Sequence, residues 1–315
     1  MKSRRVILII VIAAILLILF MLMVGAVIFA GLMAAGSDIG FGDKIALIHV
    51  EGVMTAGRGS AGVFGDSISS SERIVSMLEK ARRDDSVKGV VIRVNSPGGS
   101  PSGAQEIYNE IGRVRSEGKK VTISMGDVAA SAAYYISSGS DRIYANPATM
   151  TGSIGVIMET ANLQGLWNKL GVDMGALTTG KYKDIGSPNR PMRPDEKKLL
   201  QAMLFDIYDQ FLTDVSKGRK LDKAYVKGLA DGRVFTGRQA LKLKLVDKIG
   251  GLEDALQFAA DEAGIAGEFE VVEYGQGGLL DVLLGSTESS GAGADKGLLD
   301  FARRLLLDDK VGHIR

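Results

Sequence analysis

Patterns typical of strands and of helices alternate between residues 44 and 137, and this alternation limits the possible folds more than any other feature of the chain. Apolar, β-branched runs typical of strands cover residues 44–52, 87–94 and 120–125, whereas residues 71–83, 102–116 and 128–137 have helical spacing. Strands joined through helices form βαβ units, in which the strands lie parallel. The sequence therefore predicts an α/β fold with a mainly parallel sheet.

The rest of the chain has weaker strand patterns and stronger helical ones. Short strands are predicted at residues 142–145, 153–158 and 172–178, and helices at residues 194–217, 222–230, 237–243 and 251–263. Residues 275–297 are rich in Gly and Ser, which predicts a linker. The amphipathic pattern of residues 298–307 leaves two interpretations open, a disordered or docked terminus and a helix that binds a membrane surface or a partner.

Residues 6–35 form an apolar run without a single charge. About 20 such residues span the hydrocarbon core of a bilayer, and the apolar region of a cleaved signal peptide, the alternative, is shorter. Lys2, Arg4 and Arg5 precede the run and Asp38 is the first charge after it, so the positive-inside rule keeps the N-terminus cytoplasmic. We expect a single-pass cell-membrane protein whose residues 6–35 contact lipid and whose remaining chain is extracytoplasmic.

These features predict four segments. Residues 1–36 are the cytoplasmic basic tip and transmembrane anchor, residues 37–43 a linker, residues 44–274 the extracytoplasmic domain, and residues 275–315 the Gly/Ser-rich linker and C-terminal tail. The chain has 38 basic and 37 acidic residues, and this near-neutral balance argues against binding of nucleic acid.

The chain has no cysteine and two histidines, His49 and His313. A disulfide framework and a cysteine nucleophile are therefore excluded, and a multi-histidine metal site is not expected. We predict neither a metal nor a cofactor. The apolar surroundings of His49 predict a core or lining role rather than a catalytic one. A nucleophilic serine in this chain would need another base, and lysine serves that purpose in known Ser-Lys sites.

Two short segments offer parts of such a site. Ser131 lies among alanines where a strand pattern passes into a helix pattern, which suits a nucleophile but also suits tight helix packing. Gly98 lies in the string Asn95-Ser-Pro-Gly-Gly-Ser100, whose glycines could turn backbone N–H groups toward an oxyanion or simply form a turn. A Gly-x-Ser-x-Gly nucleophile elbow does not surround Ser131, which disfavours an α/β-hydrolase.

At these strings the chain resembles bacterial signal peptide peptidases of the SppA family, in their short, single-domain form. The matching strings run in family order: Asn95-Ser-Pro-Gly-Gly-Ser100, Met125-Gly-Asp-Val-Ala-Ala-Ser-Ala-Ala-Tyr-Tyr-Ile136, Ala145-Asn-Pro-Ala-Thr-Met-Thr-Gly-Ser-Ile-Gly-Val156, Gly180-Lys-Tyr-Lys-Asp-Ile-Gly-Ser-Pro188 and Asp231-Gly-Arg-Val-Phe-Thr-Gly-Arg238. The sequence departs from the family at Ala132 and Ala133, where glycines are common. The two extra methyl groups narrow the expected site without removing a catalytic atom.

The resemblance implies a role for each of five residues. Ser131 is the implied nucleophile and Lys183 the general base, although spacing alone does not exclude Lys181. The amides of Gly98 and Ala132 are the implied oxyanion donors, and the Ser153 hydroxyl is implied to orient the lysine amine.

The resemblance also implies a fold, an assembly and a substrate. The fold is the crotonase-like or Clp-protease-like βαβ spiral, preceded here by one N-terminal transmembrane helix. The assembly is a homo-oligomeric ring whose sites can be completed by adjacent copies. The substrates are remnant signal peptides and other unfolded apolar peptides, cleaved by a Ser-Lys dyad. Two other readings are a crotonase-like acyl-CoA enzyme, which an extracytoplasmic domain argues against, and a membrane scaffold with a peptide-binding groove.

Overall fold

The computed structural model describes residues 16–25, 42–57 and 68–275, and the account of the fold is confined to them. Residues 16–25 are helical, but the rest of the expected anchor and most of the linker lie outside the described residues, as does the tail from residue 276. Within the described ranges, no helix combines the length and the apolar character needed to cross a membrane. The unit described below ends at Tyr274.

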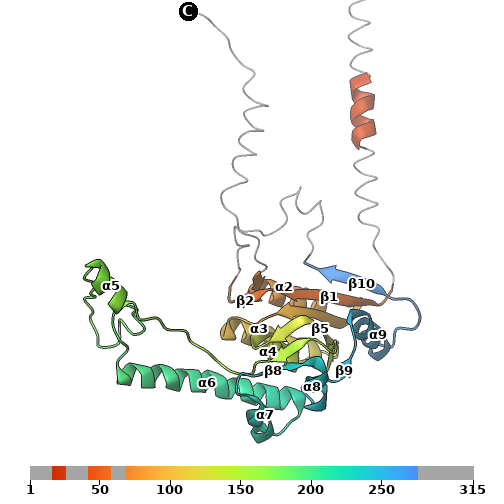
Figure 1. The fold of residues 1–315 in the computed structure, drawn as a ribbon. Coiled ribbons are helices and arrows are strands. Elements are labelled where there is room, and N and C mark those ends of the chain that lie inside the picture. The colour runs from red at the N-terminus through yellow and green to blue at the C-terminus, as the bar shows by residue number, and fades with distance from the viewer. Residues whose placement is uncertain (1–15, 26–41, 58–67, 276–315) are drawn as a thin grey trace, which may run out of the picture. The chain divides into compact units, whose positions relative to one another are not determined.

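A parallel sheet forms the centre of this unit (Figure 1). Its strands follow the order β10-β1-β4-β5-β6-β9, and every neighbouring pair is parallel. Their bounds are Glu270–Tyr274 for β10, Lys44–Glu51 for β1, Val87–Ser96 for β4, Lys120–Ala130 for β5, Arg142–Ala145 for β6 and Lys248–Ile249 for β9. The mixed α/β fold predicted from the alternating pattern is thereby confirmed.

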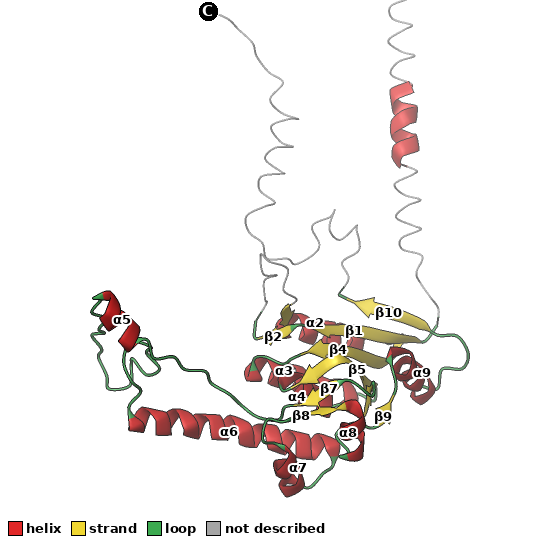
Figure 2. Cartoon of the chain, in the orientation of Figure 1, coloured by secondary structure: helices red, strands yellow, loops and turns green. Residues whose placement is uncertain are grey.

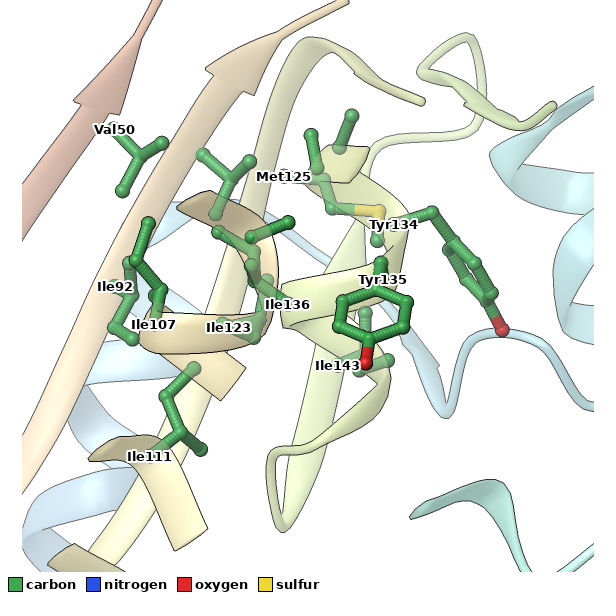
Figure 3. Packing of buried hydrophobic residues seen from close by; sticks show 14 of the residues in the cluster. Val50, Ile92, Ile107, Ile111, Ile123, Met125, Tyr134, Tyr135, Ile136 and Ile143 are labelled. Atoms are coloured by element: carbon green, nitrogen blue, oxygen red, sulfur yellow. The ribbon is translucent and has the colours of Figure 1, made fainter. Parts of the chain in front are cut away.

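Helices cover both faces of the sheet because its strands are apolar along most of their length and successive side chains point to opposite faces. The helices α2 (Ser71–Arg83), α3 (Pro101–Ser116) and α4 (Ala132–Ser138) share one core with Ile48, Ile92 and Ile123. Helix α9 (Leu252–Glu262) packs with Leu47 and Val91 on the other face. Figure 3 shows the first core at close range. Full burial of each such side chain stabilises the fold by roughly 1.5–3 kcal/mol.

Strand β5 continues beyond its predicted end and sets the position of α4. Residues 128–130, which the sequence assigned to a helix, instead pair with β7 (Met150–Gly152), so that Ala130 lies opposite Gly152. Strand β7 in turn pairs antiparallel with β8 (Val234–Thr236). The helix therefore begins only at Ala132. The local pattern could not reveal this, because the strand partner lies about 20 residues further along the chain.

Figure 2 also shows the remaining elements, some of which lie next to the sheet while others project away from it. Strands β2 (Val53–Thr55) and β3 (Ile68–Ser70) form a separate parallel pair. The later helices are α5 (Gln164–Leu170), α6 (Pro194–Arg219), α7 (Lys223–Leu229) and α8 (Gly237–Lys242). Those predicted from residue 194 onward are confirmed within two or three residues at their ends. The strands predicted at residues 153–158 and 172–178 are wrong. Ser153 and Ile154 still bond to the backbone just before β8, but among the described residues no strand pairs with residues 155–158 or 172–178, and a strand needs a partner for its backbone groups.

Residues 157–205 form a segment that we call the arm, made of α5, its flanking loops and the first part of α6 (Figure 1). Helix α5 has no buried residue, and Phe205 and Leu177 are largely exposed. The far end of α6 behaves differently, since Phe211, Leu212 and Val215 are buried in the main core. The apolar side chains of α6 form a stripe that serves the intrachain core in one half only, and the other half faces solvent.

Candidate active site

Ser131 lies at the N-cap of α4, directly after β5. Its N–H donates to the carbonyl of Gly152, 2.8 Å away, which extends the β5–β7 pairing by one bond. The side chain makes no capping hydrogen bond, so the hydroxyl is left available. The surrounding alanines Ala130, Ala132 and Ala133 are buried. The end of a core strand therefore fixes the expected nucleophile, while its oxygen is not committed to the fold.

The backbone at Ser131 adopts a conformation that few residues other than glycine adopt, with φ 54° and ψ −121°. Such conformations cost about 1–3 kcal/mol and cluster at functional sites. Gly98 lies against this turn with φ 112°, and a Cβ placed on it would meet Ser131 Cβ at 2.9 Å and Ala132 N at 3.0 Å. Only glycine fits there, which accounts for the glycine motif by close approach to the serine.

Two backbone amides flank Ser131. Ala132 is the first residue of α4, and its N–H therefore has no intrahelical acceptor. The Gly98 N–H donates to Ser96 Oγ at 3.1 Å, so an oxyanion bound there must share or replace that bond. Met54 brackets the same loop, because its N–H donates to Gly98 O and its carbonyl accepts from Ser100 N, each at 2.8 Å. The glycine loop is thus held beside Ser131 by strand β2.

Ser153 also lies next to Ser131, one residue beyond the last pair of the β5–β7 register. Its backbone has φ 50°, and its N–H donates to the carbonyl of Arg233 at 2.9 Å. The two serines with positive φ therefore sit side by side. Of the five residues that the sequence singled out, the structure brings four together: Ser131, Ala132, Gly98 and Ser153.

An apolar pocket of about 310 Å³ opens beside Ser131. Helix α3 supplies one wall, the start of α4 another, and residues 155–157 with the middle of α6 the third. The lining residues are Gly99, Pro101, Ser102, Ala104, Gln105, Ser131, Ala132, Tyr135, Gly155, Val156, Ile157, Ile207, Gln210 and Phe211. The pocket suits an apolar side chain of a bound peptide.

Tyr135 lines the pocket and contacts the part of α6 that is buried in the main core. Its ring lies 5.1 Å from the rings of both Tyr108 and Phe211, and its hydroxyl donates to the Asp214 carboxylate. Burial, followed by the bond to Asp214, raises the pKa of Tyr135, so this phenol stays protonated and acts as a fixed donor. The contact holds α6 against α4, which sets the direction in which the arm projects from the sheet and its covering helices.

Lys183 lies on the arm, in a turn between α5 and α6. Residues on both sides of it are tied to the segment just before α6, since Arg193 donates to the carbonyl of Lys181 and Arg190 to the carboxylate of Asp184. Helix α6 then runs back to Phe211 at the pocket, and at roughly 1.5 Å per residue Pro194 lies about 25 Å from Phe211 along its axis. The structure therefore does not bring Lys183 to Ser131 within one chain.

The two lysines of this turn differ in their surroundings. Lys181 Nζ lies 2.7 Å from Asp195 Oδ2, and the hydrogen bond to Asp195 raises the pKa of Lys181. A lysine held in its charged form cannot accept a proton. Lys183 is exposed, and within the described part of the chain its ammonium has no ion pair. This difference favours Lys183 over Lys181 as a base.

A core or lining role was expected for His49, and the structure shows a partly exposed side chain rather than a core one. Its side chain is 35% exposed, with Nδ1 3.8 Å from Glu51 and Nε2 3.7 Å from a Glu273 oxygen. His49 does not line the pocket of Ser131. His313 lies outside the described residues. No cluster of three potential metal ligands occurs in the ranges that the structure describes.

Sequence reasoning missed the third wall of the pocket. Ile207, Gln210 and Phe211 come from a helix about 80 residues after the nucleophile, and their helical spacing alone carried no sign of a pocket. Only the apolar stripe of α6 signalled that the helix packs against something.

Two family models match the chain. Peptidase family S49 matches residues 113–266, which include Ser131 and Lys183, and the Clp protease model matches residues 65–152, which include the glycine loop and the nucleophile.

Three relatives support the same assignment. A protein of Enterococcus faecium that carries the name signal peptide peptidase SppA is 39% identical over 73% of this chain and 67% of its own length. A protein of Synechocystis named as a protease is 41% identical over 70% of this chain and 75% of its own. One of Methanocaldococcus jannaschii, also named as a protease, is 35% identical over 80% and 82%. Together with the site around Ser131, these matches place the chain in peptidase family S49, as a serine peptidase related to signal peptide peptidase SppA.

Proposed function

We propose that this chain is a membrane-anchored serine endopeptidase that cleaves remnant signal peptides and other unfolded apolar peptides with a Ser131–Lys183 dyad. The observation that carries the proposal is the site at the end of β5, where an uncommitted serine hydroxyl lies between two backbone amides and an apolar pocket. The fold that we infer is the Clp-protease-like βαβ spiral, supported by the Clp protease match.

In the proposed reaction, the neutral amine of Lys183 takes the proton of Ser131 Oγ as this oxygen attacks the peptide carbonyl. The N–H groups of Gly98 and Ala132 stabilise the resulting oxyanion. The lysine then gives its proton to the leaving amine, which leaves an ester on Ser131. A water molecule that the lysine deprotonates hydrolyses this ester. Ser153, beside Ser131, orients the lysine amine.

Because the arm carries Lys183 away from its own Ser131, we propose that the dyad forms between two copies. Largely exposed apolar side chains on the arm, among them Ile157, Leu177 and Phe205, provide a surface that a second copy can cover. Head-to-tail contacts of this kind close into rings. Docking would also move the Lys183 amine from water into apolar surroundings, which disfavour its charged form.

The proposed location follows from the sequence. The uncharged run at residues 6–35 with its basic N-terminal flank supports a single-pass anchor with the catalytic domain outside the cytoplasm. An apolar pocket near a membrane suits peptides derived from signal sequences, which are themselves apolar.

A cleavage assay tests the proposal. The detergent-solubilised full chain, Ser131→Ala and Lys183→Ala are incubated with an unfolded apolar peptide, and the products are identified by mass spectrometry. We expect cleavage by the wild type and a loss of at least about 10³-fold in both variants. Undiminished cleavage by Ser131→Ala would refute the proposal. Absence of cleavage by all three proteins would favour a peptide-binding scaffold.

A further inference from the structure

The turn that carries Lys183 is bracketed by contacts with two arginines that lie just before α6, Arg190 and Arg193. On one side of the lysine, Arg190 Nε donates to Asp184 Oδ2 at 2.8 Å. On the other side, the Arg193 guanidinium donates to the carbonyl of Lys181. Lys183 itself remains exposed between these two attachments. The backbone on each side of the lysine is thus fixed, and its amine stays free.

Glu196 anchors the bracket to α6. This residue lies in the first turn of the helix, and its side chain is fully buried, although the segment around it is mostly exposed. Arg190 donates to both of its oxygens, Nη1 to Oε2 at 2.8 Å and Nη2 to Oε1 at 2.6 Å. The Arg193 N–H donates to Oε2 at 2.9 Å. Arg190 therefore bridges the helix and the residue next to Lys183.

Stability alone does not explain this bracket. Hydrogen bonds from Arg190 lower the pKa of Glu196 to about 2, so the buried carboxylate stays charged. Ion pairs that water can reach contribute little to stability, and the Arg190 side chain is partly exposed. The arm has no core of its own to which the pair could contribute. A geometric role accounts for the bracket better, because catalytic groups must be held within about 0.5 Å of their working position.

We propose that Arg190 is a positioning residue for the catalytic lysine. Arg190 ties Asp184 to Glu196 and thereby fixes the turn that carries Lys183. The turn is fixed before Lys183 meets the nucleophile of another copy. The inference rests on the proposed function, because it assigns Arg190 a role only through Lys183. Arg190 touches neither substrate nor reacting atoms.

The first test separates kcat from KM for the detergent-solubilised full chain on an apolar peptide. Arg190→Gln should lower kcat about 100-fold, as expected for a reacting group displaced by about 1 Å, while KM stays nearly constant because the pocket beside Ser131 is untouched. Asp184→Asn keeps the Arg190–Glu196 pair and should lower kcat by a smaller factor. This milder variant decides the question if Arg190→Gln fails to fold or assemble.

The matched control is Arg113→Gln, which removes an arginine that contacts the buried Glu110 at 2.7 Å on α3, far along the chain from the lysine turn. Its kcat should stay within about twofold of wild type, since surface changes away from special features have small effects. A loss in Arg113→Gln as large as in Arg190→Gln would show a general response to losing an Arg–Glu pair and would overturn the inference.

The second test asks whether Arg190 acts through Lys183. Hydrolysis of a p-nitrophenyl ester, whose good leaving group keeps residual rates measurable, is compared for Arg190→Gln in the wild-type and Lys183→Ala backgrounds. We expect a loss in the first background and no further loss in the second. An equal loss in the wild-type and Lys183→Ala backgrounds would overturn this inference but not the proposed function. Unchanged kcat in both Arg190→Gln and Asp184→Asn would do the same. Full activity of Lys183→Ala by itself would refute the proposed function as well.

Discussion

Ser131 and Lys183 lie in two regions that hold their side chains by different means. Ser131 ends a core strand and is surrounded by buried alanines and a glycine with no room for a Cβ. Lys183 lies on an exposed arm, where backbone hydrogen bonds of its turn and ion pairs of the residues around it hold the chain. The nucleophile is therefore preorganised by folding of a single chain. We infer that the base is preorganised in two steps, by its ionic bracket and then by contact with another copy.

Among variants that keep both dyad residues, the largest expected loss of activity comes from removing the glycine fit at the nucleophile. Gly98→Ala places a Cβ 2.9 Å from Ser131 Cβ at a backbone with φ 112°, so we expect a loss of kcat of about 10²-fold or more and destabilisation by about 1–3 kcal/mol. Gly175→Ala on the arm meets nothing within 4 Å and should be tolerated. Peptide cleavage measures the change in kcat of each variant, and urea unfolding measures the change in its free energy of unfolding. Equal responses of the two variants would remove the distinction between the regions.

Two phenylalanines of α6, one in the main core and one on the arm, should differ in their contribution to the free energy of unfolding. Phe211 is 6% exposed and contacts Tyr135, so Phe211→Ala should lower the free energy of unfolding by about 3–5 kcal/mol. Phe205 is 68% exposed, and Phe205→Ala should change that free energy by less than about 0.5 kcal/mol. We expect Phe205→Ala to weaken self-association instead, measured by analytical ultracentrifugation. Unaltered association would argue against the arm as the contact between copies.

The smallest expected effect is a pH response confined to the arm. Glu196 has a pKa lowered from 4.5 to about 2, so its stabilising contribution is present above pH 4.5 and is lost as the pH falls toward 2. Trp167 is the only tryptophan of the chain and donates to Asn189 in the arm, so its fluorescence reports on this region. The signal should be constant from pH 8 to pH 5 and change below about pH 4.5.

Glu196→Gln is the control for this acid transition and should reduce the change, while Asp184 and Asp195, whose pKa values are also lowered by their ion pairs, still titrate in the variant. A fluorescence change between pH 8 and pH 5 would show that other groups hold the arm. Constant Trp167 fluorescence over a pH range in which peptidase activity falls would show that loosening of the arm is not what stops catalysis.

The sequence predicted the helices that carry their own boundary signals. Ser70 and Ser100 cap α2 and α3, and Pro194 opens α6, so local chemistry defined these ends. The end of β5 was missed because its last residues are decided by pairing with β7, which is not local. The two apolar segments predicted as strands beyond residue 152 found no partner strand. Apolar content alone could not distinguish an arm from a sheet edge.

The residues of the site were predictable as a set, but their arrangement was not. The matching strings identified Ser131, Gly98, Ala132 and Ser153, and the paired ends of β5 and β7 explain why they meet. The separation of Lys183 follows from the length and direction of α6, which the contact between Tyr135 and Asp214 sets from far along the chain. A motif specifies which residues occur, whereas the distance between them depends on packing across the whole unit.

The central claim is that one working dyad takes Ser131 from one copy and Lys183 from another, and complementation tests it most directly. Ser131→Ala and Lys183→Ala chains are co-expressed with different affinity tags, and assemblies carrying both tags are purified and assayed on the apolar peptide. Each variant alone should be inactive, whereas mixed assemblies should regain about a quarter of the wild-type rate, because random mixing pairs an intact serine with an intact lysine at that fraction of contacts. Mixed assemblies as inactive as either variant alone would contradict the account.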